Sequence, residues 1–297
     1  MHFASIDIGS NAVRLLLSDV IESKRNPLFK KVEMVRVPLR LGEDAFLTGR
    51  ISQAKIRKLI YAMKAFRNLI DAFDAVAYRA CATSAMREAK NSSEIIQKIW
   101  REAKLKVELI NGKVEADIIY SNHVEETLNK KNSYLYIDIG GGSTELTLFS
   151  KGKCIASQSF NIGTVRMLHK KVNKEYWDFF KAWIKLVTRD ITNLTAIGSG
   201  GNINKLYRMS DKKNNKPVLY KKLKLLSEKI ESYSYDERIK ILGLKMDRAD
   251  VIVPASKIVL AVMKTAAINE MIVPQIGLAD GLVHELYEEY KKKKRKK

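Results

Sequence analysis

The chain has 297 residues, 46% of them hydrophobic, which is enough to build a core in each of two domains. Basic residues outnumber acidic ones by 54 to 33, and the formal net charge of +21 favours polyanionic partners without identifying one. No apolar stretch approaches the roughly 20 uncharged residues of a membrane helix, and the first residues read as a strand rather than a cleavable leader. We therefore expect a folded cytoplasmic protein with no membrane partner.

The cysteines, the histidines and the C-terminal charges indicate no catalytic or metal-binding site. The four histidines show no metal-ligand spacing, and Cys81 and Cys154 lie in apolar, strand-like contexts that predict reduced, buried thiols. About seven of the positive charges lie in Lys291–Lys297, which we expect to be disordered, and the rest of the chain stays at about +14.

Strands precede helices in the first part of the chain. Hydrophobic periodicity and capping residues predict two strands around Gly9 in 3–20, a third strand in 33–41, a helix capped by Ser52, a strand in 75–82, a helix from Asn91 with Glu94 completing a capping-box pattern, a strand in 107–110 and a helix in 114–123.

The second part opens in the same way. It predicts strands in 134–139, 144–150 and 154–160, a helix after 161–167, a loop in 211–217, and helices in 223–230, 235–242, 259–271 and 281–291.

The most informative stretch is Tyr136-Ile-Asp-Ile-Gly-Gly-Gly-Ser-Thr-Glu145. Its β-branched run predicts a buried strand, and Asp138 inside that strand needs a metal or hydrogen-bond donors to offset its burial. The three glycines allow a tight turn whose amides can approach a phosphate closely. A simple hairpin with a glycine turn is the alternative, and the aspartate just before the glycines counts against it.

An internal repeat strengthens this interpretation. Residues 4–17 align with 135–148, and one offset of 131 residues pairs Asp7 with Asp138 and Gly9 with Gly140. A repeat of this size predicts two α/β domains with mixed sheets, 1–125 and 126–297, whose two turns face each other across a cleft. The last helix, 281–291, could pack back on the first domain, and 292–297 form a basic tail. This layout resembles the actin-like (ribonuclease H-like) fold of sugar kinases and Hsp70 ATPases.

Local motifs narrow the choice between a nucleotide-binding kinase or ATPase and a phosphohydrolase. In order and spacing the following segments resemble the exopolyphosphatase/guanosine pentaphosphate phosphohydrolase (Ppx/GppA) family over essentially the whole chain: Asp7–Arg14, Ala82–Asn91, Asn111–Ala116, Asp138–Glu145, Gly163–Arg166, Gly198–Gly201, Arg248–Ile252 and Gly277–Gly281.

The resemblance implies hydrolysis of terminal orthophosphate from inorganic polyphosphate with Mg²⁺ or another divalent cation. It places the catalytic base on Glu115, with Asp138 and Arg87 as further catalytic residues, and it implies metal binding by Asp138 and Glu145, with Asp7 as a weaker candidate. It implies substrate binding by Ser10, Asn11, Arg14, Thr83, Ser84, Gly140, Gly141, Gly142, Ser143, Thr144 and Arg166. From position alone, Glu115 would be an ordinary first-turn glutamate that complements the helix dipole.

Two positions depart from the family pattern. The glutamate-rich loop reads Lys113-Val114-Glu115, and the last motif reads Gly277-Leu-Ala279-Asp-Gly281, where an arginine is usual. The nearest alternative activity is hydrolysis of the 5′-γ-phosphate of guanosine pentaphosphate (pppGpp). A catalytically weak protein that binds polyphosphate or an alarmone is a second alternative. Nucleic acid is not the expected partner, because only the basic tail would bind it, and kinase activity has no visible acceptor motif. A homodimer is compatible with the sequence.

Overall fold

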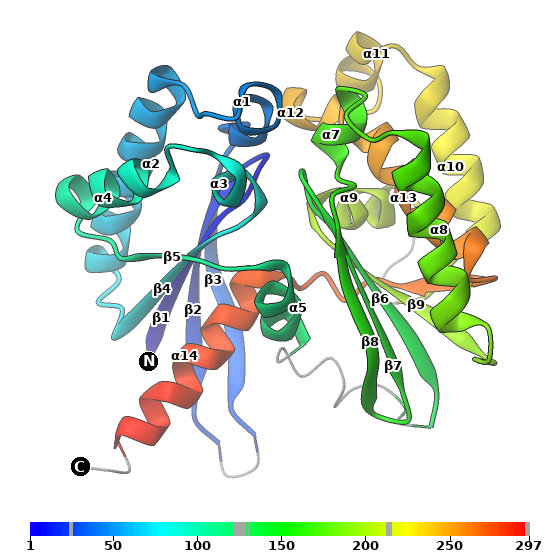
Figure 1. Cartoon of the computed structure of the whole chain (residues 1–297). Coiled ribbons are helices and arrows are strands. Elements are labelled where there is room, and N and C mark those ends of the chain that lie inside the picture. Colours follow the sequence, from blue (N-terminus) through cyan, green and yellow to red (C-terminus); the bar gives the residue numbers. More distant parts are fainter. Residues whose placement is uncertain (24–25, 121–128, 130, 212–215, 295–297) are drawn as a thin grey trace. The chain divides into compact units, whose positions relative to one another are not determined.

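The computed structural model describes residues 1–23, 26–120, 129, 131–211 and 216–294. The chain divides into two compact units: unit 1 comprises Met1–Asn122 and Gly277–Lys297, and unit 2 comprises His123–Ile276. The expected boundary at 125/126 lies outside the described residues. Each unit is an α/β structure with a mixed sheet flanked by helices, which confirms the predicted fold class (Figure 1).

Unit 1 is built on a sheet of strand order β3-β2-β1-β4-β5. The first three strands form an antiparallel meander, whereas β4 and β5 join in parallel after helical connections. Its elements are β1 His2–Ile8, β2 Val13–Ile21, β3 Leu28–Val37, α1 Leu41–Thr48, α2 Gln53–Ala72, β4 Ala77–Ala82, α3 Ser84–Glu88, α4 Ser92–Ala103, β5 Val107–Leu109, α5 Gly112–Tyr120 and α14 Leu278–Lys294.

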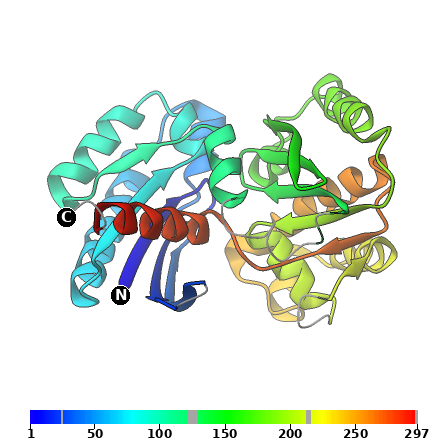
Figure 2. The same ribbon diagram turned by 90° about the horizontal axis from the view of Figure 1, so that it is seen from below.

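Both faces of the central strands β1 and β2 are buried, with alternate side chains pointing to opposite faces of the sheet. Ile6 and Leu15 belong to the core that includes residues of α2 and α4. Phe3 and Leu16 belong to a second cluster, together with Leu286 and other residues of α14. Helix α14 therefore covers the other face of the first strands, although it ends the chain (Figure 2).

Unit 2 repeats the meander and extends it. Its sheet has the order β10-β11-β9-β6-β7-β8, with β6, β7 and β8 antiparallel and β9 parallel to β6. Its elements are β6 Ser133–Ile139, β7 Thr144–Ser150, β8 Lys153–Phe160, α7 Thr164–Leu168, α8 Lys174–Thr188, β9 Leu194–Ser199, α9 Gly201–Met209, β10 Val218–Leu219, α10 Tyr220–Ser232, α11 Tyr235–Lys240, α12 Met246–Ala249, α13 Ile252–Thr265 and β11 Glu270–Ile272.

An apolar core lies between the sheet and the helices of unit 2. Leu135 and Ile137 of the central strand are fully buried with Phe180 of α8 and Val259 of α13. Phe160 stacks edge-on against Phe180 with ring centroids 4.9 Å apart, which fixes the end of β8 against α8. Among the described residues, no helix has both the length and the hydropathy needed to cross a membrane.

Several predicted boundaries were wrong for identifiable reasons. The third strand begins at Leu28 and ends at Val37, and the chain then enters α1, whose short sequence gives a weak helical pattern. Asn91 precedes α4 without capping it through its side chain, because its amide exchanges hydrogen bonds with the backbone of Ile51. The helix expected in 259–271 starts at Ile252 and ends at Thr265.

Two surface expectations also need correction. Lys291–Lys294 continue α14 instead of forming a disordered tail, and 295–297 lie outside the described residues. Cys81 is buried as predicted, but Cys154 is exposed, because it lies on β8 at the edge of the sheet.

The helix predicted in 114–123 begins at Gly112, and its residues after Tyr120 lie outside the described residues.

Candidate functional site

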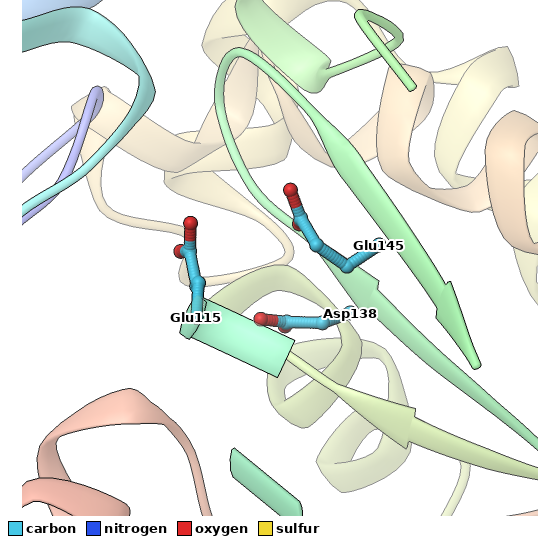
Figure 3. A group of neighbouring side chains, drawn as sticks. All are labelled: Glu115, Asp138 and Glu145. Atoms are coloured by element: carbon cyan, nitrogen blue, oxygen red, sulfur yellow. The ribbon is translucent and has the colours of Figure 1, made fainter. Parts of the chain in front are cut away.

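Two carboxylates lie side by side at the end of the central hairpin of unit 2. Asp138 of β6 and Glu145 of β7 are partners in the antiparallel register, and a carboxylate oxygen of each lies within 4.8 Å of the other. Ser159 of β8 donates a hydrogen bond to Glu145 Oε1 at 2.8 Å and so orients that carboxylate. Figure 3 shows both side chains extending from adjacent strands. Paired carboxylate oxygens are the donor set that a hard divalent cation prefers, so these two residues fit Mg²⁺.

Between these carboxylates the chain makes the second glycine turn, Gly140–Ser143, which Gly140 N–H closes by donating to Ser143 O at 2.9 Å. Three successive residues at the start of α7 bind three successive carbonyls of this turn. The amides of Thr164 and Val165 donate to Gly140 O and Gly141 O, and Arg166 Nε donates to Gly142 O at 2.7 Å.

These hydrogen bonds from α7, which we call the backing of the turn, determine the direction in which the N–H groups of the turn point. In a trans peptide the N–H lies opposite the C=O of the preceding residue. Since the carbonyls of Gly140, Gly141 and Gly142 face α7, the N–H groups of Gly141, Gly142 and Ser143 point away from it. Gly163 permits the close approach, because a Cβ there would lie 2.4 Å from Gly141 O. The turn thus presents three amides on one side, an arrangement suited to binding an anion.

The first glycine turn, Gly9–Ala12 of unit 1, is closed in the same way and is also backed by amides of the segment that begins a helix. Gly9 N–H donates to Ala12 O at 3.2 Å, and the carbonyls of Ser10 and Asn11 accept from the amides of Gly42 and Arg40 at the start of α1. Ser10 Oγ is 2.8 Å from Ser84 Oγ, which joins this turn to the turn after β4. The structure therefore brings Ser10 and Ser84 together, with Asn11 next to Ser10 in the same turn, and the contact of these residues with substrate stays a prediction.

The two turns differ in their charge. Asp7 of β1 is in register with Arg14 of β2, and the two form an ion pair with 2.5 Å between Oδ2 and Nη1. In the repeat, Arg14 corresponds to Glu145, so the first turn carries a carboxylate–guanidinium pair where the second carries two carboxylates. Asp7 remains a weaker metal candidate than Asp138 for this reason, because a guanidinium already neutralises it.

Glu115, the predicted catalytic base, lies in the first turn of α5 (Figure 3). Asn111 starts this helix, since its Oδ1 accepts from Val114 N–H and its carbonyl accepts from Glu115 N–H. Arg87 of α3 donates from Nη1 to Ile110 O at 2.8 Å and to Glu115 Oε2 at 3.3 Å. Within unit 1 the structure therefore pairs the two residues that the sequence assigns to catalysis.

Some residues that are predicted to contact substrate make hydrogen bonds within the protein. Thr144 Oγ1 donates to Ile162 O at 2.5 Å, and Arg166 holds the carbonyl of Gly142. Both residues therefore position the second glycine turn, and their contact with substrate stays a prediction. Thr83 begins the turn after β4, where its N–H donates to Ile8 O. The backing of each turn by α1 or α7 was missed from the sequence, although the repeat could have suggested it.

A third glycine turn, Gly198–Gly201, lies next to the paired carboxylates of unit 2. Gly200 has a φ of +98°, and a Cβ built on it would lie 3.1 Å from Asp138 Oδ1. Arg248 of α12 donates from Nη1 to Gly201 O at 2.5 Å, at the start of α9. Unit 2 therefore gathers two glycine turns around Asp138.

Two mixed-sheet α/β units, each with a backed glycine turn and an aspartate on the preceding strand, define a phosphate-handling protein of the actin-like fold. The chain belongs to the Ppx/GppA phosphatase family, whose family model matches residues 20–290. Among solved structures, the Aquifex aeolicus member of the Ppx/GppA family is 28% identical, with a TM-score of 0.75 over 97% of this chain and 98% of that one. An exopolyphosphatase from Cytophaga hutchinsonii, 23% identical, has the same fold, with a TM-score of 0.84 over 97% of this chain and 98% of that one.

Two curated relatives are longer than this chain. A bifunctional 3-dehydroquinate synthase/phosphatase of Fusobacterium nucleatum is 32% identical over 219 residues, which are 67% of this chain and 32% of the relative. A guanosine-5′-triphosphate,3′-diphosphate pyrophosphatase of Photobacterium profundum is 26% identical over 297 residues, or 96% of this chain and 59% of the relative. The chain thus spans about a third and about three fifths of their lengths.

Proposed function

We propose that this protein is an exopolyphosphatase, which hydrolyses the terminal orthophosphate of inorganic polyphosphate with Mg²⁺ bound. The observation that carries the proposal is the second glycine turn, whose three amides point away from α7 between two paired carboxylates. Membership of the Ppx/GppA phosphatase family supports the reaction class. The net charge of +21 suits a substrate with about one negative charge per phosphate.

Asp138 and Glu145 would hold the metal ion, because they offer adjacent carboxylate oxygens and Ser159 orients one of them. A bound Mg²⁺ neutralises negative charge on the phosphate oxygens of substrate and transition state. The amides of Gly141, Gly142 and Ser143 would bind the same terminal group. These donors are fixed by α7 before substrate arrives, which lowers the cost of reorganisation during the reaction.

Glu115 would act as the general base. Its carboxylate accepts a proton from a water molecule whose oxygen attacks the terminal phosphorus in line. A P–O bond forms to the water oxygen, and the bond to the bridging oxygen breaks with its electron pair leaving on the shortened chain. Arg87 holds Glu115 and neutralises charge on the equatorial oxygens.

The second candidate reaction is hydrolysis of guanosine pentaphosphate at its 5′-γ-phosphate. The Photobacterium profundum relative, a guanosine-5′-triphosphate,3′-diphosphate pyrophosphatase, favours it. The chemistry at the terminal phosphate would be the same, so the residues above would keep their roles. The two reactions differ only in what lies beyond the phosphate that is released.

Orthophosphate release from both substrates tests the proposal. We expect kcat/KM for long-chain polyphosphate to exceed that for guanosine pentaphosphate, and removal of divalent cations by a chelator to abolish release. A higher kcat/KM for guanosine pentaphosphate would favour the second candidate. Saturable binding of both with no release, unaffected by Glu115→Gln, would instead favour a protein that binds polyphosphate or an alarmone without hydrolysing it.

A further inference from the structure

Helix α8 of unit 2 is apolar on two sides, although only one of them joins the core. The helix packs beside α13, and its inner residues Phe180 and Ile184 are fully buried (Figure 1). Phe179, Ala182 and Leu186 lie three and four residues apart, within about 60° of one another around the helix axis, on the side away from Phe180 and Ile184. We call Phe179, Ala182 and Leu186 the apolar stripe.

The apolar stripe is open to solvent. Phe179 is 52% exposed, Leu186 is 62% exposed, and Ala182 between them is exposed as well. Single exposed apolar residues are ordinary, but three at helical spacing form a continuous strip about 10 Å long. Contiguous apolar surface of this kind on a folded protein marks contact with another molecule. The charges beside the stripe indicate which molecule that is.

One edge of the stripe carries opposite charges at its two ends. Asp178, Lys185 and Arg189 lie within about 40° of one another along this edge, with the acid nearer the start of α8 and the two bases nearer its end. Asp178 pairs with Lys181 at 3.7 Å and Arg189 with its neighbour Asp190, and these four side chains remain exposed. A partner that presents the same charges in reversed order would match this edge.

A second copy of this chain presents that reversed order. Two identical helices that pack face to face about a two-fold axis run antiparallel, and the same edge of each faces the other. With the axis midway between Phe179 and Leu186, each Phe179 meets Leu186 of the second copy. Asp178 then lies between Lys185 and Arg189 of the second copy, about 3 Å from each along the helix axis. Apolar surface thus meets apolar surface, and each acid meets bases.

We propose that the outer side of α8 is a dimer interface, in which this helix packs antiparallel against α8 of a second copy. A contact between two 15-residue helices is smaller than a standard interface of about 1,600 Å². The dimer is therefore weak, with a Kd of about 10–100 µM. The inference does not rest on the proposed function, because the oligomeric state is measured without substrate.

Sedimentation equilibrium of the full chain, from about 5 to about 500 µM, measures the dimer Kd. Leu186→Glu should raise this Kd at least about 30-fold, because it buries a charge between two apolar stripes. Leu225→Glu on α10 is the matched control, since Leu225 is 64% exposed in the same unit, and it should change the Kd less than about twofold. Thermal unfolding checks that each variant is folded.

A charge exchange tests the antiparallel arrangement. Asp178→Lys and Lys185→Glu each place like charges opposite one another, so each variant alone should dimerise about 10-fold more weakly than the wild type. An equimolar mixture of the two variants should restore the wild-type affinity, because the introduced lysine of one chain meets the introduced glutamate of the other. The effect of each single variant should shrink at about 0.5 M salt.

Each outcome decides the proposal. Dimers that Leu186→Glu disrupts, Leu225→Glu spares and the mixture of charge variants restores support the second copy as occupant. A wild type that stays monomeric up to about 500 µM would overturn it, and binding of that monomer to vesicles of anionic phospholipid would give the stripe another occupant. Dimers that both leucine variants affect equally, or charge variants that mixing does not rescue, would also overturn the interface. None of these results depends on phosphate release.

Discussion

Arg14 and Glu145 occupy equivalent positions in the two copies of the repeat, and each faces the repeated aspartate in the same antiparallel register. The hydrogen bonds that close the two glycine turns also correspond, although different donors back the carbonyls of each turn. The copies therefore share a scaffold and differ in one charge. Asp7 is neutralised by a guanidinium, whereas Asp138 lies beside a second carboxylate.

This difference predicts that the high-affinity divalent-cation site lies in unit 2. Glu145→Gln should weaken Mn²⁺ binding about 100-fold, because it removes one of two adjacent anionic ligands. Asp7→Asn, the matched change in the other copy, should alter Mn²⁺ affinity less than about threefold. Titration calorimetry with Mn²⁺ as the probe measures both constants. Equal losses in the two variants would contradict the assignment.

Gly281 of α14 should matter for catalysis although it carries no functional group. A Cβ at this position would lie 2.1 Å from the carbonyl oxygen of Ile118 in α5, so Gly281→Ala forces α14 and α5 apart. Since α5 carries Glu115, we expect kcat to fall about 10- to 100-fold with KM nearly unchanged, and stability to fall by about 1–3 kcal/mol.

Gly277→Ala in the same motif is the control, because a Cβ there meets no heavy atom within 4 Å. It should leave both kcat and stability close to those of the wild type. Steady-state kinetics and denaturant unfolding measure the two effects separately. A Gly281→Ala variant with wild-type kcat would show that this packing does not position Glu115.

Acid should weaken the ion-pair cluster that fixes α1. Burial alone would raise the pKa of Glu43, but hydrogen bonds from Arg40 and Lys55 lower it below its ordinary 4.5, and Lys55 and Ser52 likewise lower that of Asp44 below 3.8. Carboxylates with depressed pKa values contribute stability above their unfolded pKa values, and the contribution is lost as the pH falls through the folded ones.

Lys55→Met should therefore destabilise the protein by about 1 kcal/mol at neutral pH. The difference from the wild type should shrink as the pH falls below 4.5 and 3.8, the ordinary values of Glu43 and Asp44. Urea unfolding at a series of pH values measures this difference. If the difference in unfolding free energy between Lys55→Met and the wild type stays constant down to the lowest pH measured, the carboxylates do not stabilise the folded state through Lys55.

The two cysteines should differ in reactivity. Burial raises the pKa of the Cys81 thiol to about 12, so almost none of it is thiolate at pH 8, whereas Cys154 is exposed. A chromogenic thiol reagent at pH 8 should modify one cysteine in the native protein and two after unfolding. Cys154→Ser should abolish the native reaction. Rapid modification of Cys81 in that variant would show that its thiol is accessible.

The hairpins of both units could be predicted because their signals are local. Alternating or continuous apolar runs around Gly9 and around Gly140 predict the strands, whereas the register that pairs Asp7 with Arg14 and Asp138 with Glu145 comes from the structure. The repeated strand–turn–strand pattern also predicts the class of ligand. Arg87 and Glu115 are paired in unit 1, and their catalytic roles stay a prediction from the family resemblance.

What the sequence could not show depends on contacts between distant segments. The role of Asn91 is set by the backbone of Ile51, which overrides its capping pattern. Arg166 is predicted to bind substrate, and its hydrogen bond to a carbonyl of the second glycine turn could not be seen in the sequence. The hydrogen bond from Arg248 to Gly201 O could not be predicted for the same reason, because the two residues lie 47 positions apart in the sequence. Helical propensity carries no information about such partners.

Orthophosphate release by Glu115→Gln tests most directly whether Glu115 acts as the general base. With Mg²⁺ and saturating polyphosphate, this variant should bind substrate with near wild-type affinity and release orthophosphate at least about 10³-fold more slowly, because the attacking water keeps its proton. Glu94→Gln, an exposed carboxylate of α4, should leave the rate unchanged. Release at the wild-type rate by folded Glu115→Gln would show that Glu115 is not the general base.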